Sequence, residues 1–304
     1  MDLKIGSRGS PLALWQAEWA RSALQDVIPG LEVDIEVIHT KGDRVLNAPF
    51  SQIGGKGVFI KEIEDALLDR RIDLAVHSLK DLPTELPEGL EIGAISDRED
   101  VRDALVTPTG VDLESIRDGA RVGTSSLRRR AQIQYNRPDL VLEELRGNVQ
   151  TRLSKMDSEG MDAVVLAAAG LIRLGLEDRI SELLDPEFII PAPGQGALAI
   201  EVRSGDRDVQ DAVSYLDDDE TRQCVVAERT VLEVLGGGCQ VPIGVWARIN
   251  TGRMVMDGVV ALPDGTQVVR GQIEGEPDRP EDNGSDLADI LTSQGADEIL
   301  FSLD

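Results

Sequence analysis

The stretch Arg121-Val122-Gly123-Thr124-Ser125-Ser126-Leu127-Arg128-Arg129 decides the fold class. It predicts a short strand over 121–123, a small polar junction, and a helix over 127–136. The same alternation extends to both sides, with strands expected over 3–7, 31–37, 72–77, 140–145 and 163–168, and helices over 11–27, 57–69 and from 149 onward. Ser10 and Pro11 mark the start of the first helix. Alternation of this kind predicts α/β units with mostly parallel strands.

The pattern changes after Gly205. Helices are expected over 206–216 and 220–235, strands over 241–249, 254–262 and 266–273, a polar acidic loop over 277–286, and a last helix over 285–294. This predicts a C-terminal α+β domain with a three-stranded sheet. The charged segment 97–103 and the Pro/Gly segment 191–196 are expected crossings between two α/β lobes. The expected domains are a first lobe of residues 1–97 and 197–216, a second lobe of 98–196, and a C-terminal domain of 217–304.

The chain is strongly acidic, with 56 acidic against 31 basic residues and a formal net charge of −25. This argues against nucleic acid as the main partner, because phosphate contacts need a basic face. Only six basic residues are lysine, and an acidic, lysine-poor surface suits solubility at high salt, so we hypothesise a salt-accumulating halophile. We see no apolar run of about 18 residues and no signal peptide. Two cysteines favour a reducing cytoplasm, although a Cys224–Cys239 disulfide stays open, and no metal-ligand spacing is visible.

Basic residues gather in two places despite this acidity. Residues 121–152 hold seven arginines and three acids, and a second group consists of Lys41, Arg44, Lys56 and Lys61. Small polar residues accompany them where strands meet helices, in the segments 7–11, 54–57, 123–129, and 145–148 leading to 151–153. Helix-start N–H groups, hydroxyls and guanidinium forks together predict a site for a ligand with several carboxylates or phosphates. The alternative is a pair of solvated helix faces, and loop 54–57 lacks the spacing of a nucleotide triphosphate site.

Single residues stand out as candidates for chemistry. Asp81 ends the segment His77-Ser78-Leu79-Lys80-Asp81 after a buried strand, where nearby arginines would keep it ionised and able to stabilise a developing cation. The alternative is a turn-capping aspartate, and His77 is expected to be a packed strand residue. Cys239 follows Gly236-Gly237-Gly238, which predicts a thiol displayed on a loop for attachment, against the alternative of a small buried residue. Cys224 is expected to pack in a helical core.

Together these segments resemble signatures of the porphobilinogen deaminase (hydroxymethylbilane synthase) family, in the same order over nearly the whole chain. They are Ser7–Ala17, Gly54–Phe59, His77–Asp81, Gly123–Arg129, Leu145–Asn148 and Gly236–Gly244. The resemblance implies two periplasmic-binding-protein-like α/β lobes and a C-terminal α+β domain. It also implies a transferase that joins four porphobilinogen molecules head to tail with release of ammonia, then hydrolyses the product to hydroxymethylbilane for tetrapyrrole biosynthesis.

The resemblance further implies site residues. The family's cofactor is a dipyrromethane held by a thioether to a cysteine, which corresponds to Cys239, and its catalytic aspartate, which stabilises a cationic azafulvene, corresponds to Asp81. The implied cofactor-binding residues are Cys239, Lys80, Asp81, Thr124, Ser125, Ser126, Arg128, Arg129, Arg146, Gly147, Ser10 and Lys56. The implied substrate-binding residues are Arg8, Ser10, Phe59, Arg128, Arg129, Arg146, Arg152 and Arg173. One departure is Gln52, where some bacterial members have lysine, which leaves Lys56 as the basic residue of that loop.

Two other classes of function stay open at this point. A two-lobed anion-binding protein of the solute-receptor type would share the first two domains, but the C-terminal domain with Cys239 and the lack of a signal peptide argue against it. A thiol-dependent acyltransferase would need a histidine placed to activate the cysteine. We expect a cytoplasmic monomer that acts on the small molecule porphobilinogen, without nucleic acid, membrane or metal. Its acidity predicts a haloarchaeal-like member of the family.

Overall fold

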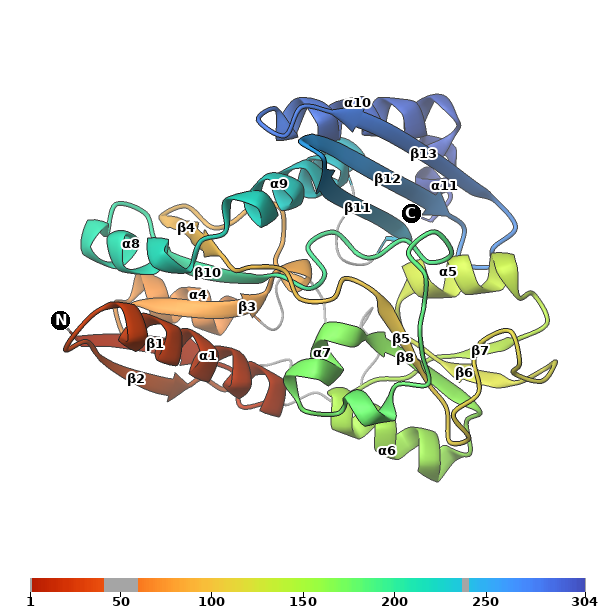
Figure 1. Cartoon of the computed structure of the whole chain (residues 1–304), viewed down its shortest axis with the longest axis horizontal. Coiled ribbons are helices and arrows are strands. Elements are labelled where there is room, and N and C mark those ends of the chain that lie inside the picture. Colours follow the sequence, from red (N-terminus) through yellow and green to blue (C-terminus); the bar gives the residue numbers. More distant parts are fainter. Residues whose placement is uncertain (1, 41–59, 237–240, 304) are drawn as a thin grey trace. The chain divides into compact units, whose positions relative to one another are not determined.

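The structure, a computed structural model, describes residues 2–40, 60–236 and 241–303 (Figure 1). The chain divides into two compact units, Met1–Arg98 with Ala197–Thr221, and Glu99–Gly196 with Arg222–Asp304. We call the first unit lobe 1. In the second unit, residues 99–196 are called lobe 2 and residues 222–304 the C-terminal domain. Lobe 1, lobe 2 and the C-terminal domain are each built on a sheet of their own.

Lobe 1 contains a five-stranded sheet in the order β2-β1-β3-β10-β4. Its strands are β1 (Asp2–Ser7), β2 (Glu32–Val37), β3 (Leu74–Ser78), β4 (Leu90–Ile95) and β10 (Leu198–Arg203). β1 pairs in parallel with β2 and β3, whereas β10 is antiparallel to β3 and β4. Of these five strands, four therefore run in one direction, which confirms the expectation of mostly parallel strands in this lobe, and β10 runs the opposite way. The reason is that the chain re-enters the lobe at Ala197 and runs back between β3 and β4.

Helices cover both faces of the lobe 1 sheet. They are α1 (Pro11–Val27), α4 (Lys61–Leu68) and α8 (Arg207–Val213), with the 3₁₀ turns η1 (Leu79–Asp81) and η3 (Ser214–Leu216). Successive side chains of a strand point to opposite faces. Leu74 and Val76 of β3 therefore enter the cluster under α1, and Ala75 the cluster under α4. The predicted start of α1 is confirmed, because the Ser10 hydroxyl accepts the Ala13 N–H at 3.3 Å.

Lobe 2 contains a second five-stranded mixed sheet, in the order β7-β6-β8-β5-β9. β6 is parallel to β7 and β8, and β5 is antiparallel to β8 and β9. α5 begins at Leu127, as predicted, because the Ser126 hydroxyl accepts the Arg129 N–H. The elements are β5 (Asp103–Val106), β6 (Arg121–Gly123), α5 (Leu127–Asn136), β7 (Val141–Glu143), α6 (Val149–Glu159), β8 (Ala163–Ala167), α7 (Ala168–Arg173), η2 (Glu177–Arg179) and β9 (Glu182–Leu183).

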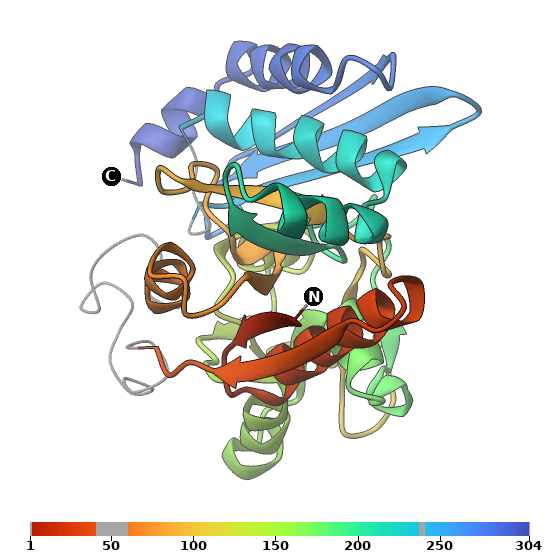
Figure 2. The ribbon, with the colours of Figure 1, turned by 90° about the vertical axis from the view of Figure 1, so that its left-hand side faces the viewer.

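The C-terminal domain carries the expected three-stranded antiparallel sheet, in the order β11-β12-β13. Its elements are α9 (Asp219–Val234, entering from lobe 1), β11 (Ile243–Asn250), β12 (Arg253–Ala261), β13 (Val268–Gly275), α10 (Pro280–Ser293) and α11 (Ala296–Phe301). α10 lies along the sheet (Figure 2). Gly258 and Gly271 allow this close packing, since a Cβ at either would come within 3.2 Å of Leu287. The fold class expected from the sequence is therefore confirmed.

The predicted acidic loop over 277–286 is wrong from residue 280 onward. Residues 280–286 form the first two turns of α10. Pro280 occupies the first helical position, and Glu281 and Asp282 follow in the first turn. A proline at this position has the helical φ already, and acidic side chains interact favourably with the positive end of the helix dipole. The same residues that looked like loop residues in composition are a helix start.

Candidate functional site

In lobe 1, the predicted site residues follow the carboxyl ends of β1 and β3. These strands are parallel neighbours, so the segments that leave them start from the same edge of the sheet, where ligands bind in open α/β folds. Arg8 follows β1 and is half-buried, and Ser10 caps α1. Lys80 is half-buried and Asp81 exposed, both in η1 directly after β3. The structure thus brings the four described lobe 1 candidates to one sheet edge.

The turn that carries Asp81 is held by main-chain hydrogen bonds. The Leu79 N–H donates to the Ala197 carbonyl of the returning chain at 3.1 Å, and the Leu82 N–H closes the turn onto the Leu79 carbonyl. One side chain supports the strand end, since the Gln16 amide donates to the Ser78 hydroxyl at 2.8 Å. Asp81 is therefore an exposed carboxylate on a rigidly attached turn.

In lobe 2, predicted residues again follow parallel strands at one edge. Thr124, Ser125 and Ser126 come after β6, and Arg146 with Gly147 after β7. The hydroxyls are engaged within the lobe: Thr124 accepts the Ser126 N–H at 3.2 Å, Ser125 donates to the Leu145 carbonyl, and Ser126 caps α5. The three hydroxyls therefore fix the junctions between the strands and helix α5.

Arg128 and Arg129 are buried together against one carboxylate. Arg128 Nη1 lies 2.8 Å from Asp103 Oδ2, and Arg129 Nη2 lies 2.8 Å from Asp103 Oδ1. The Gln195 amide donates to the same Oδ1 at 2.9 Å. Asp103 is 0% exposed and both arginines are at most 5% exposed. Burial raises the pKa of Asp103, but the charges of Arg128 and Arg129 outweigh it and hold that pKa well below its usual range.

This cluster has an excess of positive charge. Two guanidinium groups against one carboxylate leave a net charge of +1 in the interior of lobe 2. The Nε atoms of Arg128 and Arg129 are buried and have no hydrogen-bond partner. Buried donors without partners are costly, so the cluster is suited to a further anionic group.

The other predicted arginines make contacts within lobe 2. Arg146 forms an ion pair with Glu144, Arg152 Nε donates to the Gly147 carbonyl at 2.7 Å, and Arg173 Nη2 donates to the Gly196 carbonyl at 2.6 Å. Gly147 has a φ of 125° and a Cβ there would lie 2.6 Å from Thr151, so this position requires glycine.

The positive stretch 121–152 is partly neutralised by its own acids. Each of its three acids pairs with one of its arginines, in the pairs Arg121–Glu143, Arg137–Asp139 and Arg146–Glu144. The local excess of charge seen in the sequence therefore overstates what the folded lobe offers to a ligand. What stands out is the buried pair Arg128 and Arg129.

Lys56, Phe59, Gln52 and Cys239 lie outside the described residues, as does loop 54–57. The elements on either side of Cys239 are described. Glu228 of α9 is 0% exposed, and its carboxylate accepts the Gly194 N–H at 2.7 Å and the Ala247 N–H of β11 at 2.8 Å. Cys224 is buried in the C-terminal core, as expected. Glu228 of α9 therefore links α9 to β11 and to the segment at Gly194 that precedes β10.

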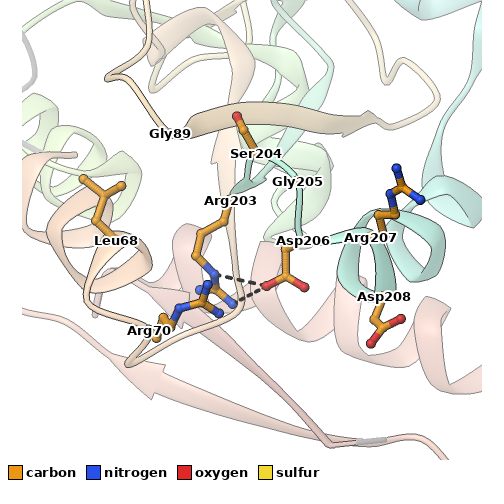
Figure 3. Close-up of a pocket in the computed structure, with 9 residues that line it drawn as sticks. All are labelled: Leu68, Arg70, Gly89, Arg203, Ser204, Gly205, Asp206, Arg207 and Asp208. Atoms are coloured by element: carbon orange, nitrogen blue, oxygen red, sulfur yellow. Dashed lines mark hydrogen bonds and ion pairs between the residues drawn. The ribbon is translucent and has the colours of Figure 1, made fainter.

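A depression of about 510 Å³ in lobe 1 lies among residues that were not predicted (Figure 3). Its wall includes Arg203, whose Nη1 donates to the Leu67 and Ile72 carbonyls and whose Nη2 and Nε donate to Asp206. The Arg203 guanidinium thus fixes the end of β10 by hydrogen bonds to its neighbours. We therefore interpret this depression as a structural contact between α4 and α8.

Three fully buried acids, each 0% exposed, were not among the predicted site residues: Asp103, Glu201 and Glu228. A weak signal existed for the first two. Asp103 begins the apolar run Asp103-Ala104-Leu105-Val106, and Glu201 interrupts Leu198-Ala199-Ile200-Glu201-Val202. A single acid inside an apolar strand needs a buried partner. Nothing in the sequence identified those partners.

In the part of the chain that the structure describes, no helix is both long and apolar enough to cross a membrane, and no three His, Cys, Asp or Glu side chains are grouped to hold a metal ion. The fold and the strand-end residues define a class: a protein of two α/β lobes, with polar and cationic groups at the carboxyl ends of parallel strands, and a separate α+β domain.

Two family models cover most of the chain. They are "Porphobilinogen deaminase, dipyromethane cofactor binding domain" over residues 3–211 and "Porphobilinogen deaminase, C-terminal domain" over residues 222–293. The porphobilinogen deaminases of Pelobacter propionicus and Acidithiobacillus ferrooxidans are each 51% identical over 299 residues, covering 98% of this chain and 96% and 97% of theirs. That of a Synechococcus species is 50% identical over 305 residues, covering 99% and 96%. The chain belongs to the porphobilinogen deaminase family.

These relatives come from bacteria, so they give no support to a haloarchaeal-like origin. Among solved structures, the methionine binding protein MetQ matches 73% of this chain and 92% of its own, with 14% identity and a TM-score of 0.47. A score this low does not define the fold, which rests here on the sheet topologies themselves.

Proposed function

We propose that this protein is a hydroxymethylbilane synthase. It condenses four porphobilinogen molecules head to tail with release of ammonia, then hydrolyses the product to hydroxymethylbilane, which feeds tetrapyrrole biosynthesis. The observation that carries this proposal is the match to both porphobilinogen deaminase models over residues 3–211 and 222–293. The sheet edges add support, since their cationic and N–H groups suit a substrate that carries two carboxylates per ring.

The residues fit a dipyrromethane group. The buried net charge of +1 at Asp103, Arg128 and Arg129 and the two unpartnered Nε atoms suit a carboxylate-bearing cofactor. Cys239 would hold the group by a thioether, with Arg128, Arg129 and Arg146 on its carboxylates and Lys80, Thr124, Ser125, Ser126, Gly147, Ser10 and Lys56 as further contacts. When bound, the group supplies the pyrrole ring from which the chain is extended.

The chain's own residues supply binding and charge stabilisation. Arg8, Arg152 and Arg173, with Ser10 and Phe59, would bind substrate together with Arg128, Arg129 and Arg146. Loss of ammonia leaves a positive charge on the substrate, and a fixed carboxylate lowers the free energy of that state. Asp81 is exposed on a fixed turn at the sheet edge and suits this role.

Intact-protein mass tests the proposal. The wild-type chain should exceed its sequence mass by two pyrrole units and give colour with an aldehyde reagent for pyrroles. Cys239→Ser should lose both signals. The control Cys224→Ser, at the other cysteine, should keep both. An unmodified wild-type chain would instead favour the two-lobed anion-binding protein.

Substitution of Asp81 tests the catalytic assignment. Asp81→Ala should lower kcat by about a hundredfold or more and change KM little, because the carboxylate acts mainly in the transition state. Asp26→Ala, at an exposed position of α1, is the matched control and should keep wild-type kcat. Near-normal turnover of Asp81→Ala would show that another group stabilises the charge.

We also propose three domains, formed by residues 1–97 with 197–216, by 98–196 and by 217–304. The three separate sheets support this division. The form we propose is a cytoplasmic monomer.

The net charge of −25 supports adaptation to high salt, and an anionic substrate should be repelled less when that charge is screened. Turnover should therefore rise with KCl, and a steady fall toward molar KCl would contradict the salt hypothesis.

A further inference from the structure

Three ionisable side chains come together in the core of lobe 1, and none of them is among the predicted site residues. His77 of β3 and Glu201 of β10 form a pair, with Nε2 2.9 Å from Oε2. His77 is 8% exposed and Glu201 is 0% exposed. Glu64 of α4 is also buried, and the charges of both Glu201 and His77 act on it. The function assigned above uses none of the three.

The geometry of the sheet explains why they meet. His77 lies opposite Ala199 and Glu201 opposite Ala75, so these two ionisable residues are diagonal neighbours on one face of the β3–β10 ladder. Ala75 contributes to the cluster under α4, so this is the face that Glu64 covers. The other face of the same two strands is apolar and packs under α1.

The cluster does not serve as ordinary core filling. A buried ion pair stabilises a fold weakly, and apolar residues of similar volume often do as well or better. Glu201 Oε1 is buried and has no hydrogen-bond partner, which adds cost. In some proteins, buried polar pairs of this kind specify one arrangement of the fold.

The pairing of β3 with β10 holds the turn of Asp81 in place. Among the described residues, β3 pairs with β1 only at Leu74 and Ala75, whereas β10 pairs with it from Leu74 to Ser78. The carboxyl half of β3 therefore depends on β10, and the carbonyl of Ala197, the residue just before β10, accepts the N–H of Leu79 at the start of η1. The His77–Glu201 contact is the side-chain link across this half of the ladder.

We propose that His77 and Glu201, with Glu64 beside them, are positioning residues that fix the register of β3 against β10 and thereby the place of Asp81 at the sheet edge. The inference rests on the proposed function, because it takes Asp81 as the group that acts on substrate. None of the three touches the substrate in this account. Their effect reaches it through three residues of backbone.

Kinetics of conservative variants test the proposal. Glu201→Gln changes one atom of the side chain and removes the charge, and it should lower kcat about tenfold with KM within about twofold. His77→Phe fills the space without a donor and should lower kcat to a similar extent. His77→Gln supplies an amide N–H donor to Glu201 and should recover most of the loss. All three should keep the dipyrromethane mass and the pyrrole colour.

A matched control separates positioning from general weakening. Val202→Ala lies on the same strand as Glu201 but on its apolar face, in the α1 cluster. It should lower the urea midpoint and leave kcat within about twofold of wild type. The proposal is overturned if Glu201→Gln and His77→Phe keep wild-type kcat, or if Val202→Ala loses as much kcat as they do.

Asp81→Ala, measured in the same assay, distinguishes the positioning role of the cluster from the catalytic role of Asp81. If it loses turnover while the cluster variants do not, only the positioning role fails. If Asp81→Ala itself keeps turnover, the assigned role of Asp81 fails and the positioning role fails with it.

Discussion

Lobe 1 and lobe 2 share a sheet layout but bury their charges differently. In the sheet of each lobe, three neighbouring parallel strands lie next to an antiparallel strand, which is β10 in lobe 1 and β5 in lobe 2. That antiparallel strand carries a fully buried acid. Glu201 of β10 contacts His77, and the charge of Glu201 helps to raise the pKa of the nearby Glu64. Asp103 of β5 pairs with two arginines, which stay charged at any ordinary pH.

The difference shows what each buried acid can do. In lobe 1 the raised pKa of Glu64 favours its neutral form beside Glu201, so this cluster calls for no further ligand. The arginine pair in lobe 2 keeps a fixed excess of +1, which only another anion can balance. The same sheet layout therefore holds two different buried clusters. The one around Glu201 in lobe 1 needs no ligand, and the one around Asp103 in lobe 2 is suited to bind an anion.

Removing the charge of Asp103, which pairs with Arg128 and Arg129, should have the largest effect on stability. Asp103→Asn leaves two buried guanidinium groups without a counter-charge, and it should lower the free energy of unfolding by about 3–5 kcal/mol at neutral pH. Urea unfolding followed by circular dichroism measures this. The pKa of Asp103 is lowered in the fold, so wild type should keep this stabilisation above the unfolded value of 3.8 and lose it as pH falls further. A loss below about 1 kcal/mol would show that the arginines need no such partner.

The titratable cluster should respond to pH in the opposite sense. The pKa of Glu64 is raised from 4.5 to about 7, first by burial and then by the charge of Glu201, with His77 opposing. Between these values the unfolded carboxyl is ionised while the folded one holds its proton, so wild-type stability falls as pH rises. Glu64→Gln should remove this fall and exceed wild type by about 1–2 kcal/mol near pH 8, with no difference near pH 4. Parallel pH curves for the two proteins would contradict the raised pKa of Glu64.

The smallest effect is expected at an exposed ion pair. Arg121 and Glu143 form a two-point contact at the surface of lobe 2, and Glu143→Gln should lower the urea midpoint only slightly. High KCl should abolish that small loss, because salt screens exposed charges, while the Asp103→Asn loss should persist. Equal salt sensitivity of the two losses would show that the Asp103 cluster is accessible to solvent ions.

Much of this architecture was predictable from local sequence. Helix 127–136 and strand 121–123 matched the structure residue for residue, because a hydroxyl cap and a change of hydrophobic period lie within a few residues of each other. The placing of Arg8 and Asp81 at one sheet edge was predictable because β1 and β3 are parallel. The placing of the lobe 2 hydroxyls was predictable in the same way from β6 and β7. These features depend on neighbours in the chain, so the chain reveals them.

The missed features depend on distant partners. Glu201 and His77 are 124 residues apart, and Asp103 and Arg129 are 26 apart. The antiparallel course of β10 was equally hidden, since only the path of the returning chain determines it. Helix α11 was missed because residues 296–301 are too few to show a helical period. The assigned roles of Asp81, Cys239 and the arginines rest on the family, and kinetics must test them.

The returning strand β10 also sets the order in which the chain can fold. All five strands of lobe 2 lie between residues 103 and 183, but lobe 1 lacks its fifth strand, β10, until residue 203. During synthesis the edges of β3 and β4 therefore stay unpaired while the whole of lobe 2 is made, and open strand edges invite wrong pairing. Lobe 2 can complete its sheet first, although lobe 1 begins the chain, and the turn of Asp81 becomes fixed only when β10 arrives.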